Sequence, residues 1–318
     1  QRIGLGQFAV FGKANPDRTI LLIRVTQYAW CFPENPSSSL YGLYNVIAQI
    51  MKPDDELAEA YNEALALEKA GDHAAAAKAY ARVLALDPDD HGGAAVRLAA
   101  MGLGDTPERA PEAYVEMLFD QHAGVFDDIL VDQLGYHVPL LMRQALLDQA
   151  RGPYARLLDL GCGTGLAGVA LADMSDHRTG IDLSANMIDL AAEHELYDDL
   201  YVGDAVSFVE EVDDEPWDLV AATDVLPYLG DVAALFAGVR RISAASAVFG
   251  FSTEALPDAA MGERDFIVGP HQRFVHKLAY IDTALTAAGF TLLHASDITV
   301  RHEEGTPQPG HLVLAKTV

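Results

Sequence analysis

Cysteines, basic residues and long apolar runs are scarce in this sequence. Only two cysteines occur among 318 residues, Cys31 and Cys162, which excludes a disulfide-rich scaffold and favours a reducing, cytoplasmic setting. Apolar runs such as Thr19 to Val25 are strand-sized, far short of the roughly 20 residues that cross a bilayer as a helix. The sequence therefore predicts a protein without a membrane span.

Lysine and arginine are outnumbered by acids. The 21 basic residues face 47 aspartates and glutamates, which gives a formal net charge of −26. A surface this acidic repels phosphate backbones, so RNA and DNA are disfavoured as substrates. The small basic clusters, Arg240-Arg241 and Arg273 with Lys277, are expected to be solvated helix ends.

Several catalytic motifs are also missing. The sequence has no G-x-S-x-G elbow, no G-x-x-x-x-G-K-[ST] loop and no cysteine and histidine spacing typical of zinc ligands. A serine-hydrolase nucleophile, a P-loop phosphate site and a common zinc site are thereby excluded. No metal ligands are predicted.

The run from Leu158 to Gly165, L-D-L-G-C-G-T-G, is the most informative motif. It follows a strand-like segment from Arg156 to Leu160 and precedes a helix-like one from Leu166 to Met174. Glycines in such a turn bring bare backbone against a ligand, and the next helix offers its N-terminal amides. The dinucleotide fingerprint G-x-G-x-x-G would need another glycine where Leu166 stands, so the loop is of a different type.

Acidic residues stand where the next strands are expected to end. Thr179 to Leu183 is typical of a second strand. Its Asp182 follows the first glycine by roughly 20 residues, the distance at which a carboxylate accepts hydrogen bonds from ribose hydroxyls. Ser184 is expected to cap the helix from Ala185 to His194. Leu200 to Ala205 is typical of a third strand that ends in a turn.

The fourth strand is predicted to end beside a ligand crevice. Asp218 to Asp224 is mostly apolar, and in an open α/β sheet the carboxyl ends of the strands border the bound ligand. Asp224 is therefore predicted to lie in the site, with Leu226 and Tyr228 as candidate pocket walls. Asp231 is expected to cap the next helix.

The C-terminal third is predicted to complete the sheet. Ala245 to Ser252 is typical of a fifth strand, and Thr253 to Val275, with its prolines and glycines, of a loop or lid. The final strands, Thr291 to Arg301 and His311 to Val318, are expected to form a hairpin. A nicotinamide-dependent dehydrogenase would instead continue into a substrate domain, so this ending disfavours that class.

The G-x-G-x-G loop, Asp182 behind it and the closing hairpin together resemble the class I S-adenosylmethionine (SAM)-dependent methyltransferases. The resemblance covers about Tyr114 to Val318. It implies an α/β fold with a Rossmann-like, seven-stranded sheet whose last strand is reversed, and SAM as the cofactor. The cofactor-binding residues that it implies are Asp159, Gly161, Cys162, Gly163, Gly165, Asp182, Leu183, Met187, Asp204, Ala205 and Asp224.

The same resemblance implies roles around the cofactor. Asp204 stands where an acid of the family meets the adenine amino group, although it also fits an N-cap for the following helix. Phe126, Asp127 and Tyr136 are implied to line the acceptor side, where Phe126 also fits plain core packing.

Three residues are candidates for catalysis: His276, Asp224 and Tyr228. His276 is the candidate general base because imidazole titrates near neutrality. The alternative for His276 is a surface or capping histidine. A base is needed only for an acceptor that is protonated at neutral pH, so its use stays open.

The N-terminal part differs in composition from the rest. Residues 1–50 are poor in acids and begin with glutamine, so we interpret them as a non-native or loosely ordered leader, with the natural start at Met51. Helices are predicted for Glu56 to Ala70 and for His73 to Leu86, with Gly71-Asp72 at the turn.

A faint repeat follows this helix pair. Gly71-Asp72 recurs as Gly104-Asp105, and Ala79-Tyr80 recurs as Ala113-Tyr114, each at about the 34-residue period of tetratricopeptide (TPR) units. The region therefore resembles a TPR pair. Two interpretations stay open: a groove for a protein partner or for self-association, or a helical cap that completes the fold.

The sequence thus predicts four regions: a leader at 1–50, TPR-like helices at 51–112, a helical cap over the site at 113–150 and a SAM-binding domain at 151–318. The predicted function is methyl transfer from SAM to a small molecule, with an oxygen, nitrogen or carboxyl acceptor left open. The alternatives are a non-catalytic scaffold that keeps the SAM fold for docking and, less favoured, a nicotinamide-dependent oxidoreductase.

Overall fold

The computed structural model describes residues 9–12, 52–123, 134–149, 151–303 and 305–318. The chain divides into two units, one made of residues 1–12 and 89–318 and the other of residues 13–88. The larger unit holds the sheet and the candidate site. The region boundaries predicted at residues 50, 112 and 150 stay predictions.

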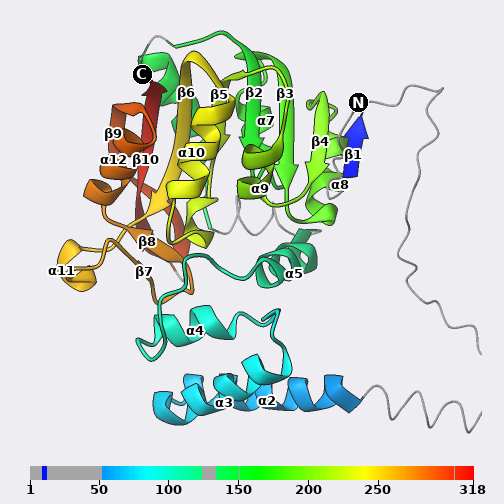
Figure 1. Cartoon of the computed structure of the whole chain (residues 1–318), viewed down its shortest axis with the longest axis vertical. Coiled ribbons are helices and arrows are strands. Elements are labelled where there is room, and N and C mark those ends of the chain that lie inside the picture. The colour runs from blue at the N-terminus through cyan, green and yellow to red at the C-terminus, as the bar shows by residue number, and fades with distance from the viewer. Residues whose placement is uncertain (1–8, 13–51, 124–133, 150, 304) are drawn as a thin grey trace, which may run out of the picture. The chain divides into compact units, whose positions relative to one another are not determined.

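A mixed, mostly parallel sheet forms the centre of the larger unit (Figure 1). The strand order along it is β1-β4-β3-β2-β5-β6-β10-β9. Strands β4, β3, β2, β5 and β6 are parallel, and β10 runs antiparallel to both β6 and β9. The predicted α/β class and reversed last strand are therefore confirmed. The strands are β1 (Ala9–Gly12), β2 (Tyr154–Leu160), β3 (Ser175–Asp182), β4 (Asp199–Val202), β5 (Trp217–Ala222), β6 (Ser243–Glu254), β7 (Phe266–Val268), β8 (Phe274–His276), β9 (Phe290–Glu303) and β10 (Thr306–Thr317).

Over the residues that the structure describes, the sheet has ten strands, so the predicted count of seven is wrong. Strand β1 adds an antiparallel edge to β4, and the short hairpin β7–β8 joins β6 where Glu254 pairs with Val275. The stretch from Thr253 to Val275, predicted as a loop or lid, instead contains helix α11 (Asp258–Met261) and most of this hairpin. Its prolines and glycines lie between short elements, which local composition does not separate from a loop.

Helices cover both faces of the sheet. Helices α9, α10 and α12 share one face (Figure 1), where Phe208 and Phe236 pack with the buried phenylalanines of β6. Helix α6 packs on the other face through Met142 and Leu146. The helices of this unit are α4 (Ala94–Ala100), α5 (Glu112–His122), α6 (Val138–Asp148), α7 (Leu166–Ala170), α8 (Ala185–Glu193), α9 (Ala205–Glu211), the 3₁₀ turn η3 (Leu226–Tyr228), α10 (Ala233–Ile242) and α12 (Leu278–Ala287), besides α11.

Strand β2 shows how the sequence builds this sandwich. Leu158 and Leu160 join the core under α10, whereas Leu157 joins the core under α6. Successive side chains of a strand point to opposite faces, so a strand covered on both sides carries apolar residues on both of its faces, as Leu157 and Leu158 do here. The strand therefore carries the glycine loop to the edge of the sheet on a rigid base.

The elements beside the loop begin and end slightly off their predicted bounds. Helix α7 ends at Ala170, not at Met174, because a turn leads directly into β3 at Ser175. The predicted cap of α8 is confirmed, since the Ser184 hydroxyl accepts a hydrogen bond of 3.1 Å from the Met187 amide. Because α7 has only five residues, the backbone of the glycine loop is the main structure at this end of β2.

The smaller unit is described over helices α2 (Lys52–Lys69) and α3 (His73–Leu86). Asp72 caps α3 by accepting a hydrogen bond from the Ala75 amide, and the rings of Tyr61 and Tyr80 meet edge to face. The TPR assignment stays a prediction. Of the predicted leader, only residues 9–12 fall within the described residues. Across the residues that are described, no helix combines the length and the apolar character that a membrane crossing needs.

Candidate functional site

A pocket lies at the carboxyl ends of β2, β3, β4 and β5. It encloses about 990 Å³ of empty space, part of it continuous with solvent. The glycine loop lines one side, and aromatic side chains line another. Among the predicted site residues, those that line the pocket are Gly161, Cys162, Gly163, Asp182, Leu183, Asp204, Ala205, Asp224, Tyr228 and Tyr136.

Five predicted site residues do not line the pocket: Asp159, Gly165, Met187, Leu226 and His276. Leu226, predicted as a pocket wall, is instead fully buried in the core beside Phe236 and Val220. Gly165 begins α7 in the left-handed conformation and faces Tyr197, and Met187 is fully buried in α8. These two support the loop from behind. Phe126 and Asp127 lie outside the described residues.

The glycine loop depends on the absence of side chains. Gly161 has a φ of +63°, and a Cβ atom built there would lie 2.6 Å from Val225 Cγ2. Gly163 has a φ of +53°, and its amide donates a hydrogen bond of 2.9 Å to Asp182 Oδ2. Because both glycines line the pocket, the loop presents bare backbone to whatever binds there.

Asp182 ties the loop to the start of α8. Its Oδ2 accepts from the Gly163 amide and its Oδ1 from the Ser184 amide, each at 2.9 Å. Burial raises the pKa of Asp182 to about 6, against the opposing effect of these amides. Each oxygen of a carboxylate keeps a second lone pair, so Asp182 can still accept hydrogen bonds from hydroxyls of a bound ligand.

Asp159 supports the site from beneath it. The carboxyl is fully buried, and its Oδ2 accepts a hydrogen bond of 2.5 Å from the Tyr197 hydroxyl. Burial raises the pKa of Asp159 to about 7, and the nearby Asp182 adds to this effect. The other oxygen, Oδ1, has no hydrogen-bond partner among the described residues, so an uncharged carboxyl suits this place best.

The raised pKa of Asp159 predicts a pH-dependent gain from Asp159→Asn. In the unfolded chain an aspartate ionises near pH 4, so ionisation destabilises the fold increasingly from about pH 4 to pH 7. Asparagine cannot ionise and keeps an oxygen for Tyr197. The variant is expected to exceed the parent in free energy of unfolding by a few kcal/mol at pH 8 and by clearly less at pH 5. Urea denaturation at both pH values measures this difference, and a gain equal at the two would contradict it.

Asp224 follows β5 in a strained conformation. Its φ is +63°, a value rare outside glycine. The Asp224 amide donates to Ser252 Oγ at 2.9 Å, and Asp224 Oδ2 accepts from Arg273 Nη1 at 3.0 Å. The residue lines the pocket. Two strands and an arginine therefore fix this carboxylate where the fourth strand was predicted to meet the ligand.

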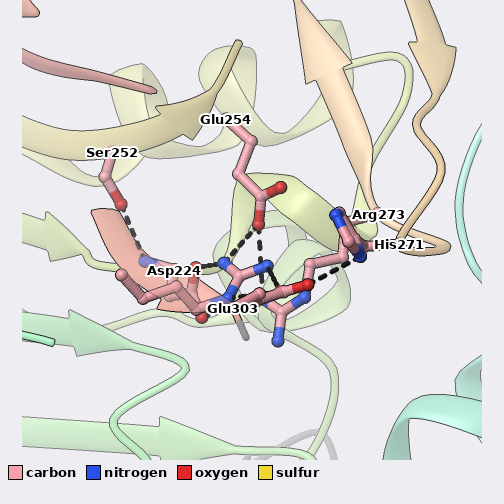
Figure 2. Close-up of polar contacts among 7 residues, drawn as sticks. Asp224, Ser252, Glu254, His271, Arg273 and Glu303 are labelled. Carbon is pink, nitrogen blue, oxygen red and sulfur yellow. Dashed lines mark hydrogen bonds and ion pairs between the residues drawn. The ribbon is translucent and has the colours of Figure 1, made fainter. Parts of the chain in front are cut away.

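A buried network of charges lies behind Asp224 (Figure 2). Arg301 is 1% exposed and donates from Nη1 to Glu254 at 2.5 Å and from Nε to Glu303 at 2.8 Å. Arg273 Nη1 lies 3.6 Å from the same Glu254. Figure 2 shows these carboxylates and guanidinium groups converging, with His271 bound to Glu303 at the edge.

The solvated position expected for Arg273 is wrong. Its guanidinium pairs with Asp224 and stacks 5.3 Å from the centre of the Tyr228 ring. Arg273 lies between the strands of the hairpin β7–β8, which joins the sheet where Val275 of β8 pairs with Glu254 of β6. That pairing of distant segments leaves no trace in the local sequence, which shows only an arginine near a lysine.

Aromatic side chains form the other wall. Tyr228 lies in η3, and its ring meets Phe119 of α5 edge to face at 5.4 Å. Burial raises the pKa of Tyr228 and the pKa of Tyr136 above the ordinary range, so both hydroxyls stay protonated at neutral pH. Phe119 and Val115 line the pocket from α5.

His276 lies behind the pocket wall. It is 1% exposed, and its Nε2 donates to the carbonyl oxygens of Leu229 and Gly230 at 2.8 and 3.2 Å. Burial lowers the pKa of His276 to about 4. The surface or general-base positions considered for it do not match this place, because a neutral imidazole committed to two backbone carbonyls does not reach an acceptor in the pocket.

His276→Ala is accordingly expected to act on stability. Removing the donor leaves two buried carbonyls with a lost partner, which costs about 1 to 3 kcal/mol of unfolding free energy. Urea denaturation measures the loss. A hundredfold fall in enzymatic rate at unchanged stability would restore the general-base prediction.

Some of the pocket residues that sequence reasoning missed lie ahead of the glycine loop's strand, β2. Arg109 lines the pocket and pairs with both Glu112 and Asp204. Asp204 also caps α9, since its Oδ1 accepts from the Ser207 amide at 2.9 Å. The N-cap interpretation of Asp204 is therefore confirmed, and the residue also lines the pocket, whereas its contact with an adenine amino group stays a prediction. Nothing in the sequence around Arg109 distinguishes it from a surface arginine.

Comparison with known proteins identifies part of this unit. Residues 158–249 match the family described as "Methyltransferase domain". The chain is 48% identical over 48 residues to an 18S rRNA (guanine-N(7))-methyltransferase of Arabidopsis thaliana, covering 15% of this chain and 17% of that protein. It is 37% identical over 84 residues to a ubiquinone biosynthesis O-methyltransferase of Xylella fastidiosa, covering 26% and 34%.

A solved structure of an S-adenosylmethionine-dependent methyltransferase from Clostridium acetobutylicum is also similar, at 16% identity and a TM-score of 0.47, over 63% of this chain and 99% of that one. The matched part of the chain spans 17% and 34% of the length of the two curated relatives named above. Residues 158–249 form a methyltransferase domain, as the glycine loop predicted, and its cofactor is SAM.

Proposed function

We propose that this chain transfers the methyl group of SAM to a small-molecule acceptor bound beside Tyr228 and Asp224. The observation that carries the proposal is one pocket with two chemically different sides. The glycine loop, Asp182 and Asp204 line the first, and Phe119, Tyr136, Tyr228 and Asp224 line the second.

The residues on the first side fit the cofactor. Bare backbone at Gly161, where a side chain would collide with Val225, leaves room for a ligand to approach closely. Asp182 holds free lone pairs for ribose hydroxyls, and Asp204 Oδ2 is open to an adenine amino group because the hydrogen bonds that Asp204 accepts from described residues use Oδ1. We infer that Leu183 and Ala205 pack against the purine.

When bound, SAM supplies a sulfonium-activated methyl group, and the protein aligns the acceptor with it. Phe119, Val115 and Leu229 keep water from the second side through their apolar surfaces. Asp224 is the carboxylate on this side that can take a hydrogen bond or a proton from an acceptor hydroxyl or amine. Tyr228, protonated and held between Phe119 and Arg273, shapes the acceptor wall.

The acidity of the chain supports a small acceptor over a nucleic acid. The formal net charge of −26 opposes the approach of a polyanion. One curated relative is named for methylation of rRNA and another for ubiquinone biosynthesis, so the relatives favour neither class.

The test uses the full chain with methyl-labelled SAM and two acceptor pools from cells, metabolites below 3 kDa and total RNA. The expected result is label in the metabolite pool, absent with Asp182→Ala. Label in RNA would replace the small acceptor with a nucleic acid. Tight SAM binding with no transfer to either pool would favour the non-catalytic scaffold, and binding of NADH in place of SAM would favour an oxidoreductase.

A further inference from the structure

Arg109 connects two of the loops that line the pocket, the loop after β5 and the loop after β4. The Ala110 amide donates to the Tyr228 carbonyl at 2.8 Å, and the Glu108 carbonyl accepts from the amides of Gly230 and Asp231 at 2.7 and 2.9 Å. Arg109 itself forms a β-bridge with Leu229. These bonds fix the Arg109 backbone to the loop that follows β5, where part of the pocket wall is formed.

The side chain of Arg109 reaches the loop that follows β4. Its Nη1 lies 3.3 Å from Asp204 Oδ1, and its Nη2 pairs with Glu112. All three residues line the pocket. The two carboxylates hold the guanidinium at both ends, which fixes its plane while leaving the side chain 37% exposed.

A guanidinium group whose plane is fixed beside Asp204 is suited to stacking on a flat ligand ring. Guanidinium groups stack on aromatic rings, and an ammonium group cannot reproduce that contact. Asp204 Oδ1 holds Arg109, and its Oδ2 is open to an adenine amino group. A purine bound at Asp204 would therefore lie within reach of the Arg109 plane.

We infer that Arg109 is a cofactor-binding residue that closes the pocket over the adenine ring of SAM, with Asp204 and Glu112 positioning its guanidinium. The inference rests on the proposed function, since it concerns the adenine of the same cofactor. It assigns the adenine end of the site to a segment ahead of the methyltransferase domain, outside residues 158–249.

The test is calorimetric titration of the full chain with SAM, S-adenosylhomocysteine and methylthioadenosine, which share adenosine but differ in the amino-acid part and the charge. Arg109→Ala is expected to weaken all three by a similar factor, about 3- to 30-fold. Arg109→Lys keeps the positive charge and is expected to recover little of the loss. Arg143→Ala, which breaks an exposed ion pair with Asp173, is the matched control and is expected to bind all three normally.

The other outcomes overturn the inference in different ways. Unchanged or tighter binding by Arg109→Ala would show that the arginine does not contact the adenine or blocks it. A loss confined to SAM and S-adenosylhomocysteine would place Arg109 at the amino-acid part, and full recovery by Arg109→Lys would leave only its charge. If the unmodified chain binds none of the three, the proposed cofactor is wrong, and the role inferred for Arg109 is wrong with it. Thermal unfolding of each variant verifies that it is folded.

Discussion

Replacing Asp182 with alanine is expected to weaken SAM binding by about 1 to 3 kcal/mol, roughly 5- to 150-fold in the dissociation constant. Two losses add. The carboxylate no longer accepts hydrogen bonds from the ribose, and the amides of Gly163 and Ser184 lose the acceptor that fastens the glycine loop to α8. The loop then becomes ordered only when the ligand binds, and the entropy lost in ordering it reduces the binding free energy.

Calorimetric titration with SAM measures the effect, and two variants sharpen it. Asp182→Asn keeps the shape but turns an NH₂ group towards one of the two amides, so it is also expected to bind weakly. Asp189→Ala removes an equal charge from the exposed face of α8 and is expected to bind as the parent does. Unchanged affinity in Asp182→Ala would contradict the ribose assignment.

Local pattern was enough to predict the glycine-loop side of this pocket. Strand β2, the glycine loop, β3 and Asp182 follow one another within about 30 residues, the span of a single βαβ unit, so their contacts are set by neighbours in sequence. The Ser184 cap and the reversed hairpin at the end of the sheet are local features too. Each was predictable because its residues need nothing distant to adopt their conformation.

The contacts that Arg273 and Arg109 make were not predictable, for the opposite reason. Arg273 reaches Asp224 only because β8 pairs with β6, and Arg109 reaches Asp204 only because its backbone bonds to the loop after β5. The position of His276 was not predictable either. The sequence does not distinguish a histidine that faces a ligand from one that is buried against backbone carbonyl groups. Burial decides the protonation of such a residue, and burial is a property of the assembled fold.

Replacing Arg301 with methionine is expected to lower the free energy of unfolding by about 3 to 5 kcal/mol. Arg301 is 1% exposed and bonds to Glu254 and Glu303. Without Arg301, the remaining ion pair of Glu254 among the described residues is the longer one with Arg273, at 3.6 Å. A buried carboxylate whose charge is only weakly paired lowers the free energy of unfolding. Methionine fills similar volume, so the loss reports charge and not a cavity.

Guanidinium denaturation of four proteins tests this: the parent, Arg301→Met, Arg301→Met with Glu254→Leu, and Arg143→Ala. The second substitution removes the stranded charge, so the double variant is expected to recover more than half of the loss, because a buried ion pair and an apolar pair of similar size are close in free energy. Arg143→Ala breaks an exposed pair and is expected to cost less than about 1 kcal/mol. A double variant no more stable than Arg301→Met would show that Arg301 stabilises the fold through its contacts with Glu303 and its packing, and that the Glu254 charge contributes little.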